Sequence, residues 1–139
     1  MDATPYAAGD VAWILTACAL VLMMTIPGLA LFYGGMVKRA NVLATLMQAL
    51  GAAGLVSVVW VVAGYSFAFG GGGTDVFGGF DRLLLSGLSL DSVAAGLPEP
   101  VFILFQMTFA IITVAIIAGA AAERLSFKAW MIFTPIWLL

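Results

Sequence analysis

Six residues between positions 102 and 116 have the types and spacing to attract a small cation. They recur at steps of three and four: Phe102, Phe105, Gln106, Phe109, Thr113 and Ile116. Steps of that size place side chains on one face of an α-helix. The face of an aromatic ring attracts a cation by about 0.5 to 2 kcal/mol, so the pattern suits weak cation binding. It equally suits packing of the rings against lipid or against other helices.

Gln106 is the most polar side chain of this face. An amide left unpaired in lipid costs a few kcal/mol, so Gln106 is predicted to face protein or water. Its partner could be a bound substrate or a neighbouring helix.

The remaining composition argues against an enzyme. The chain has no histidine, which is the commonest proton shuttle and metal ligand, and a single cysteine, Cys18. Its Cys, Asp and Glu residues show no metal-ligand spacing. Five basic residues against seven acidic ones give a net charge of −2 and no basic patch for nucleic acid. We therefore predict no metal, no cofactor and no nucleic-acid partner, with Cys18 as a buried small side chain.

The elements that must position the aromatic face are membrane helices. Of the 139 residues, 64% are hydrophobic and 9% are charged, and the mean hydropathy is +1.18, values typical of a membrane protein. A helix of about 20 apolar residues spans a bilayer. The sequence predicts an all-α polytopic protein with helices over 11–37, 42–69 and 101–122, and a partial fourth over 127–139. At about 1.5 Å per residue the fourth reaches only about 20 Å, so we expect an N-terminal part of a longer protein or a re-entrant segment.

Charges in the connecting segments predict the orientation. The basic residues Lys38, Arg39, Arg124 and Lys128 flank the first, third and fourth helices, whereas the connection over 70–100 carries Asp75, Asp81, Asp91 and Glu99 against Arg82 alone. By the positive-inside rule the basic connections are cytoplasmic. The chain is therefore predicted to be a multi-pass protein of the cell membrane with its N-terminus outside.

Local features predict how the helices end and pack. Pro27 is expected to kink the first helix, and Gly28, Gly34 and Gly35 are expected to permit close approach of other backbones. The segment over 81–90 could lie as a short amphipathic piece on the membrane surface. Glu123 and Arg124 are expected to pair at the end of the third helix.

Three stretches resemble the ammonium transporter family, the Amt/Mep/Rh superfamily, and its Amt branch in particular. They are MTIPGLALFYGGMVKRANVL over 24–43, VVWVVAGYSFAFG over 58–70 and FQMTFAIITVAIIAGAAAERLSFKAW over 105–130. The resemblance implies a homotrimer in which each subunit has its own hydrophobic pore, built from eleven helices as two inverted halves. This chain would supply the first three helices and part of the fourth.

The same resemblance assigns roles to individual residues. Phe109 matches the family phenylalanine of the outer ammonium-recruiting site, with Phe105 one turn above it and Gln106 beside it. Phe32 and Tyr33 match aromatic residues near the cytoplasmic exit of the pore. The pore histidines that separate the proton from ammonia would follow residue 139. Ammonium, ammonia or methylammonium, membrane lipid and a cytoplasmic regulator of the PII type are the implied partners.

Two other functions fit the sequence. Some Amt-like domains act as ammonium sensors joined to a signalling module, and a small structural membrane subunit could have the same helices. Because no residue between 101 and 122 can relay a proton, the chain by itself is not expected to transport ammonium.

Overall fold

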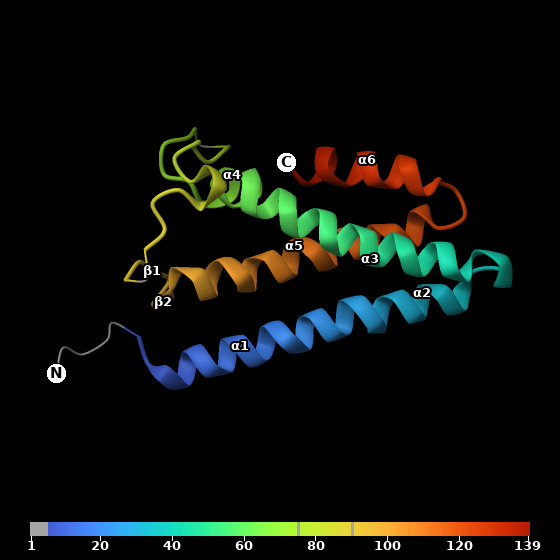
Figure 1. The fold of residues 1–139 in the computed structure, drawn as a ribbon, viewed down its shortest axis with the longest axis horizontal. Helices are drawn as coiled ribbons and strands as arrows, with labels where there is room; N and C mark the ends of the chain where they lie inside the picture. The colour runs from blue at the N-terminus through green and yellow to red at the C-terminus, as the bar shows by residue number, and fades with distance from the viewer. Residues whose placement is uncertain (1–5, 75, 90) are drawn as a thin grey trace.

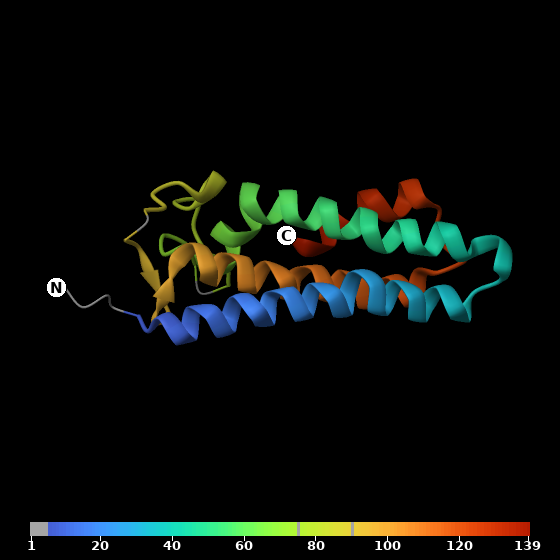
Figure 2. The same ribbon diagram turned by 60° about the horizontal axis from the view of Figure 1, so that its bottom comes forward.

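A computed structural model describes residues 6–74, 76–89 and 91–139 as an elongated helical bundle (Figures 1 and 2). The first span, Ala8–Met36, consists of α1 (Ala8–Met23), a π-helical segment η1 (Met24–Leu29) and α2 (Ala30–Met36). The second, Arg39–Phe69, consists of η2 (Arg39–Asn41), α3 (Val42–Val59), a π-helical segment η3 (Trp60–Gly64) and α4 (Tyr65–Phe69). The third is α5 (Glu99–Ala121), and the shorter α6 (Phe127–Leu138) follows it.

The three spans are long and apolar enough to cross a membrane, with 29, 31 and 23 residues and mean hydropathies of 2.2, 2.0 and 2.5 over an 18-residue stretch of each. Within lipid the backbone must satisfy its own hydrogen bonds, which continuous helices do. The largest difference from the predicted ranges is at the starts: the first span begins at Ala8 rather than residue 11, and the second at Arg39 rather than residue 42. The predicted fold class, an all-α arrangement of three spans and a partial fourth helix, is confirmed.

The first span remains one helix through Pro27, where a kink was predicted. Proline has no N–H to donate to the carbonyl four residues earlier. Residues Met24–Leu29 accommodate this by forming a wider π turn, and the hydroxyl of Thr25 donates to the Val21 carbonyl at 2.8 Å. Figure 1 shows α1 and α2 continuing in one direction across this turn.

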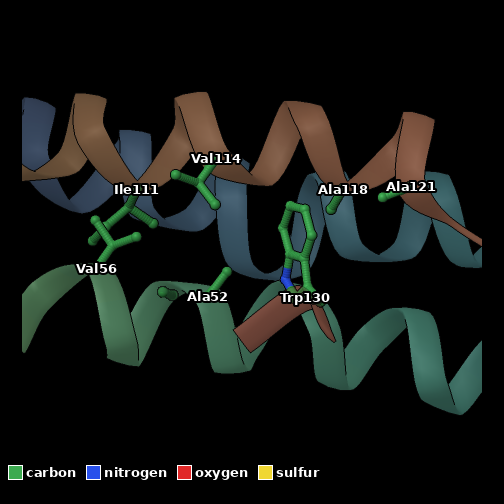
Figure 3. Packing of buried hydrophobic residues seen from close by; sticks show 8 residues of the cluster. Ala52, Val56, Ile111, Val114, Ala118, Ala121 and Trp130 are labelled. Atoms are coloured by element: carbon green, nitrogen blue, oxygen red, sulfur yellow. The ribbon is translucent and has the colours of Figure 1, made fainter. Parts of the chain in front are cut away.

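The core lies between α3, α5 and α6 (Figure 3). It contains Ala52, Ala53, Val56, Ile111, Val114, Ala118, Ala121 and Trp130. The small alanines let α3 and α5 approach closely, the usual packing device where lipid offers no hydrophobic drive between helices. The indole of Trp130 fills the space that α6 covers, and its Nε1 donates to the Gln48 carbonyl at 3.1 Å. Cys18 is also buried, as predicted.

Of the three glycines predicted to permit close packing, only Gly34 is packed against another helix among the described residues. Gly34 packs against side chains of α3, with Leu46 and Val42 atoms 3.6 Å from where a Cβ would lie. A Cβ at Gly28 would meet only the Met23 carbonyl of its own helix, and one at Gly35 would meet nothing within 4 Å. Within the three spans the tightest glycine is Gly119 of α5, where a Cβ would overlap the ring of Tyr33.

The described residues of the connection over 70–98 lie at the same end of the bundle as the start of α1, which we call the outer end after the predicted topology (Figure 1). Its only strands in the described residues are β1 (Val93–Ala94) and β2 (Leu97–Pro98), an antiparallel hairpin that the sequence did not predict. Over 81–89, the described part of the expected amphipathic piece, there is only a 3₁₀ turn, η4 (Leu83–Leu85), because Leu84 and Leu85 adopt positive φ values of 53° and 56°. Leu90 lies outside the described residues.

The basic loops lie together at the opposite end, which we call the inner end (Figure 1). Here the predicted pairing of Glu123 with Arg124 is wrong. Glu123 has a φ of 63°, and its Oε1 accepts hydrogen bonds from the Lys38 backbone N–H at 2.8 Å and from Asn41 Nδ2 at 3.0 Å. These two donors hold the pKa of the Glu123 carboxyl below its usual range. The carboxylate therefore joins the loop after α5 to the loop before α3.

Candidate functional site

The candidate site is the face of α5 that the rest of the described chain leaves open. Phe109 is 44% exposed and Ile116 is 53% exposed, and Thr113 between them is also exposed. Ile111 is 2% exposed and packs in the core. Two residues correspond to about 200° around a helix, so Phe109 and Ile111 point to opposite sides. The helix has one packed face and one open face, as the predicted spacing requires.

Phe105 and Phe109 form an aromatic pair on the open face. Their ring centroids are 4.9 Å apart and their planes meet at 88°, an edge-to-face arrangement. Gln106, beside them, is partly exposed. The Thr113 hydroxyl donates to the Phe109 carbonyl at 2.7 Å, so its proton is already used within the helix. The rings and the Gln106 amide are therefore the groups that this face can offer to a ligand.

Phe102, at the outer end of the predicted stripe, packs against the second span. Its ring lies 5.1 Å from that of Phe69, which in turn contacts Tyr65 at 5.5 Å and Trp60 at 6.4 Å. Sequence reasoning did not identify this aromatic cluster. It fixes the outer half of α5 against η3 and α4, and it separates Phe102 from the open pair.

A buried carboxylate supports the same cluster. Glu99, 4% exposed, accepts a hydrogen bond from the Tyr65 hydroxyl at 2.9 Å and forms an ion pair with Arg82 at 3.4 Å. It is the one ion pair among the residues that the structure describes. From the sequence, the charges of Glu99 and Arg82 predicted only the orientation in the membrane. An acidic residue between two prolines at a helix start was the available signal for a structural role.

The second predicted pair, Phe32 and Tyr33, lies at the inner end of the same α5 face. The Tyr33 hydroxyl donates to the Ile116 carbonyl at 3.3 Å, and the ring covers Gly119. Phe32, 60% exposed, meets Tyr33 edge to face at 5.3 Å. The structure thus brings the two predicted groups of residues to opposite ends of one helix face.

This arrangement can attract and guide a small cation or a neutral molecule, but it lacks a proton acceptor of its own. Between Val101 and Ala121, the polar side chains of α5 are those of Gln106, Thr108 and Thr113, and all its other residues are apolar or small. None of these side chains is titratable. Proton transfer along this face would need groups from other segments.

Comparison with known proteins gives one family. The profile of the Ammonium Transporter Family matches residues 12–139. A putative ammonium transporter of Methanothermobacter thermautotrophicus is 45% identical over 132 residues, covering 93% of this chain and 32% of that protein. An ammonium transporter of Bacillus subtilis is 46% identical over 122 residues, covering 86% of this chain and 30% of that protein.

The fold agrees with the sequence comparison. The crystal structure of Mep2 from Candida albicans matches 96% of this chain with a TM-score of 0.84 and 34% identity, over 29% of the Mep2 chain. This chain therefore spans about a third of the length of the relatives that it matches. With nearly all of its residues matched by the family profile and its helices superposing on those of Mep2, the chain belongs to the Ammonium Transporter Family.

Proposed function

We propose that the complete protein carries ammonium, as ammonia, across the cell membrane, and that this chain supplies the outer recruiting residues and part of the pore. The observation that carries the proposal is the open α5 face, which has the Phe105–Phe109 pair at one end and the Phe32–Tyr33 pair at the other. The relatives are named ammonium transporters. Membership of their family supports ammonium as the substrate of this face.

The mechanism follows from the cost of moving charge through lipid. Ammonium is first held at the outer end by the Phe109 ring, with Phe105 beside it and the Gln106 amide as a hydrogen-bond acceptor. A charge at bilayer depth costs at least about 2.5 to 3.5 kcal/mol, whereas neutral ammonia avoids that cost. An apolar face therefore suits ammonia. The proton needs a separate relay, which the family resemblance assigns to histidines outside this chain, and Phe32 and Tyr33 border the exit.

We further propose a homotrimer in the cell membrane with the N-terminus outside and an inner surface open to a PII-type regulator. The basic residues of the inner end support this orientation. Two other functions remain, an ammonium sensor with a signalling module and a structural subunit. Neither of them would give ammonium uptake, which distinguishes them from a transporter.

Uptake by cells without ammonium transporters of their own tests the function. The full-length protein is expected to restore growth on limiting ammonium and to give saturable uptake of labelled methylammonium. The 139-residue chain alone is expected to restore neither, because it contains no histidine to relay the proton. Full-length protein that reaches the membrane without giving uptake would contradict transport and favour a sensor or a structural subunit. Rescue by the short chain would contradict the proposed proton relay.

Labelling of single cysteines tests the orientation. With Cys18 replaced by Ala, Ser89→Cys at the outer end should react with an impermeant thiol reagent added outside intact cells. Ala40→Cys at the inner end should react only after the membrane is opened. The side chains of Ser89 and Ala40 are both exposed. Labelling of both from the same side would contradict the three-span topology.

A further inference from the structure

Arg82 is the only basic residue in the connection over 70–100, and thus the only one that the proposed topology places outside. A cation at the entrance of a cation-recruiting face would repel the substrate. The structure holds the Arg82 guanidinium against Glu99, with Nη1 and Oε1 3.4 Å apart. The Arg82 side chain is 34% exposed and that of Glu99 is 5% exposed, so the carboxylate holds the guanidinium from the protein side.

Both partners of this ion pair are fixed in place. Glu99 accepts a hydrogen bond from the buried Tyr65 hydroxyl, and its backbone N–H donates to the Ser92 carbonyl at 2.8 Å. The Arg82 backbone N–H donates to Ser66 Oγ at 3.1 Å. Because Ser66 is fully buried in α4, the outer loop, the second span and the start of α5 all meet at this pair.

The pair lies at the end of α5 that is nearer to the aromatic face. Glu99 is the first residue of α5, and Phe105 and Phe109 follow six and ten residues later. At about 1.5 Å per residue the Cα atoms of these two residues lie about 9 and 15 Å further along the helix axis. The Debye length is about 8 Å at 0.15 M salt and about 30 Å at 0.01 M. An unpaired guanidinium at the helix start would therefore act on a cation near Phe105, and more strongly at low salt.

We propose that Glu99 is a positioning residue for cation recruitment, which it serves by neutralising Arg82 at the outer entrance of the α5 face. The inference rests on the proposed transport function. It adds Glu99 as a residue that acts on the substrate only through Arg82. Glu99 does not touch the cation. Its carboxylate removes a repulsive charge from the approach to Phe105 and Phe109.

The Glu99→Gln variant of the full-length protein, reconstituted in liposomes, tests this role. A glutamine has nearly the same shape and can still accept the Tyr65 hydrogen bond, but it cannot neutralise Arg82. At about 0.01 M salt the KM for methylammonium is expected to rise about two- to fivefold, with kcat unchanged at equal protein. The rise should shrink toward the wild-type value as salt increases. A second substitution, Arg82→Gln, should return the KM of Glu99→Gln toward that of the wild type.

Asp91→Asn is the matched control. It removes the same charge from the same outer connection at an exposed position, and its KM should remain near the wild-type value. An equal rise in KM for Asp91→Asn would overturn the inference, because any lost acidic charge would then suffice. A fall in kcat for Glu99→Gln at unchanged KM, without rescue by Arg82→Gln, would also overturn it and indicate a purely structural role. Failure of the wild-type protein to take up methylammonium would overturn the proposed function itself and this inference with it. A wild type that transports while Glu99→Gln matches it in KM would overturn the inference alone.

Discussion

In the full-length protein, Phe109→Ala is expected to raise the KM for methylammonium by about 2- to 30-fold, or to weaken discrimination against metal cations. The substitution removes a ring whose attraction for a cation is about 0.5 to 2 kcal/mol. It also removes one partner of the edge-to-face pair with Phe105, so the remaining ring loses its neighbour. Saturable uptake of methylammonium in liposomes, with competition by potassium, measures both effects.

Ile111→Ala is the matched control for Phe109. Ile111 lies two residues away on the same helix but is 2% exposed in the core between α3 and α5. Its truncation should cost about 2 to 5 kcal/mol of stability and leave the KM unchanged in the protein that folds. The comparison therefore uses equal amounts of folded protein. If Phe109→Ala keeps the wild-type KM and selectivity while Ile111→Ala changes them, the open face of α5 is not the recruiting face.

Trp130→Ala is expected to destabilise the fold by about 3 to 5 kcal/mol, the cost of emptying a large core site. Trp130 is 0% exposed, packs with Val56 and Val114 in the main core, and stacks on Phe133 with ring centroids 5.7 Å apart. Its loss also leaves the buried Gln48 carbonyl without the indole donor. The temperature at which detergent-solubilised protein unfolds is the measurement, and it should fall clearly.

Trp137→Ala tests whether that loss is specific to the core. Trp137 is the same residue type on the same helix, but it is 46% exposed. It should lower the unfolding temperature much less than Trp130→Ala does. Equal effects of the two substitutions would show that α6 is not packed on α3 and α5 as described.

The long helices could be predicted from the sequence because lipid leaves the backbone few alternatives. The period of the phenylalanines likewise predicted that Phe109 lies on one face of α5, and the exposed fractions of Phe109 and Ile111 agree with two distinct faces. The ligand-binding role of Phe105, Gln106 and Phe109 remains a prediction. So does the exit role of Phe32 and Tyr33.

The features that sequence reasoning missed depend on partners far away in the chain. Glu123 was expected to pair with its neighbour Arg124, yet its partners lie 82 and 85 residues earlier. In the sequence Gly119 is indistinguishable from the other small residues around it, and only the position of the Tyr33 ring makes its lack of a Cβ necessary. Glu99 and Arg82 are separated by a hairpin that has no strong strand pattern. Local sequence propensity cannot predict any of these contacts, because each depends on how the spans are placed side by side.

The Glu123 contact has a consequence for biogenesis. Its acceptor is synthesised 85 residues after the Lys38 N–H that it binds. At the usual translation rates of about 5 to 20 residues per second, this interval is about 4 to 17 s. The first two spans must therefore stay in the translocon or the bilayer without this hydrogen bond until the third span has been inserted. The bond between Lys38 and Glu123 can form only when the three spans are aligned with one another.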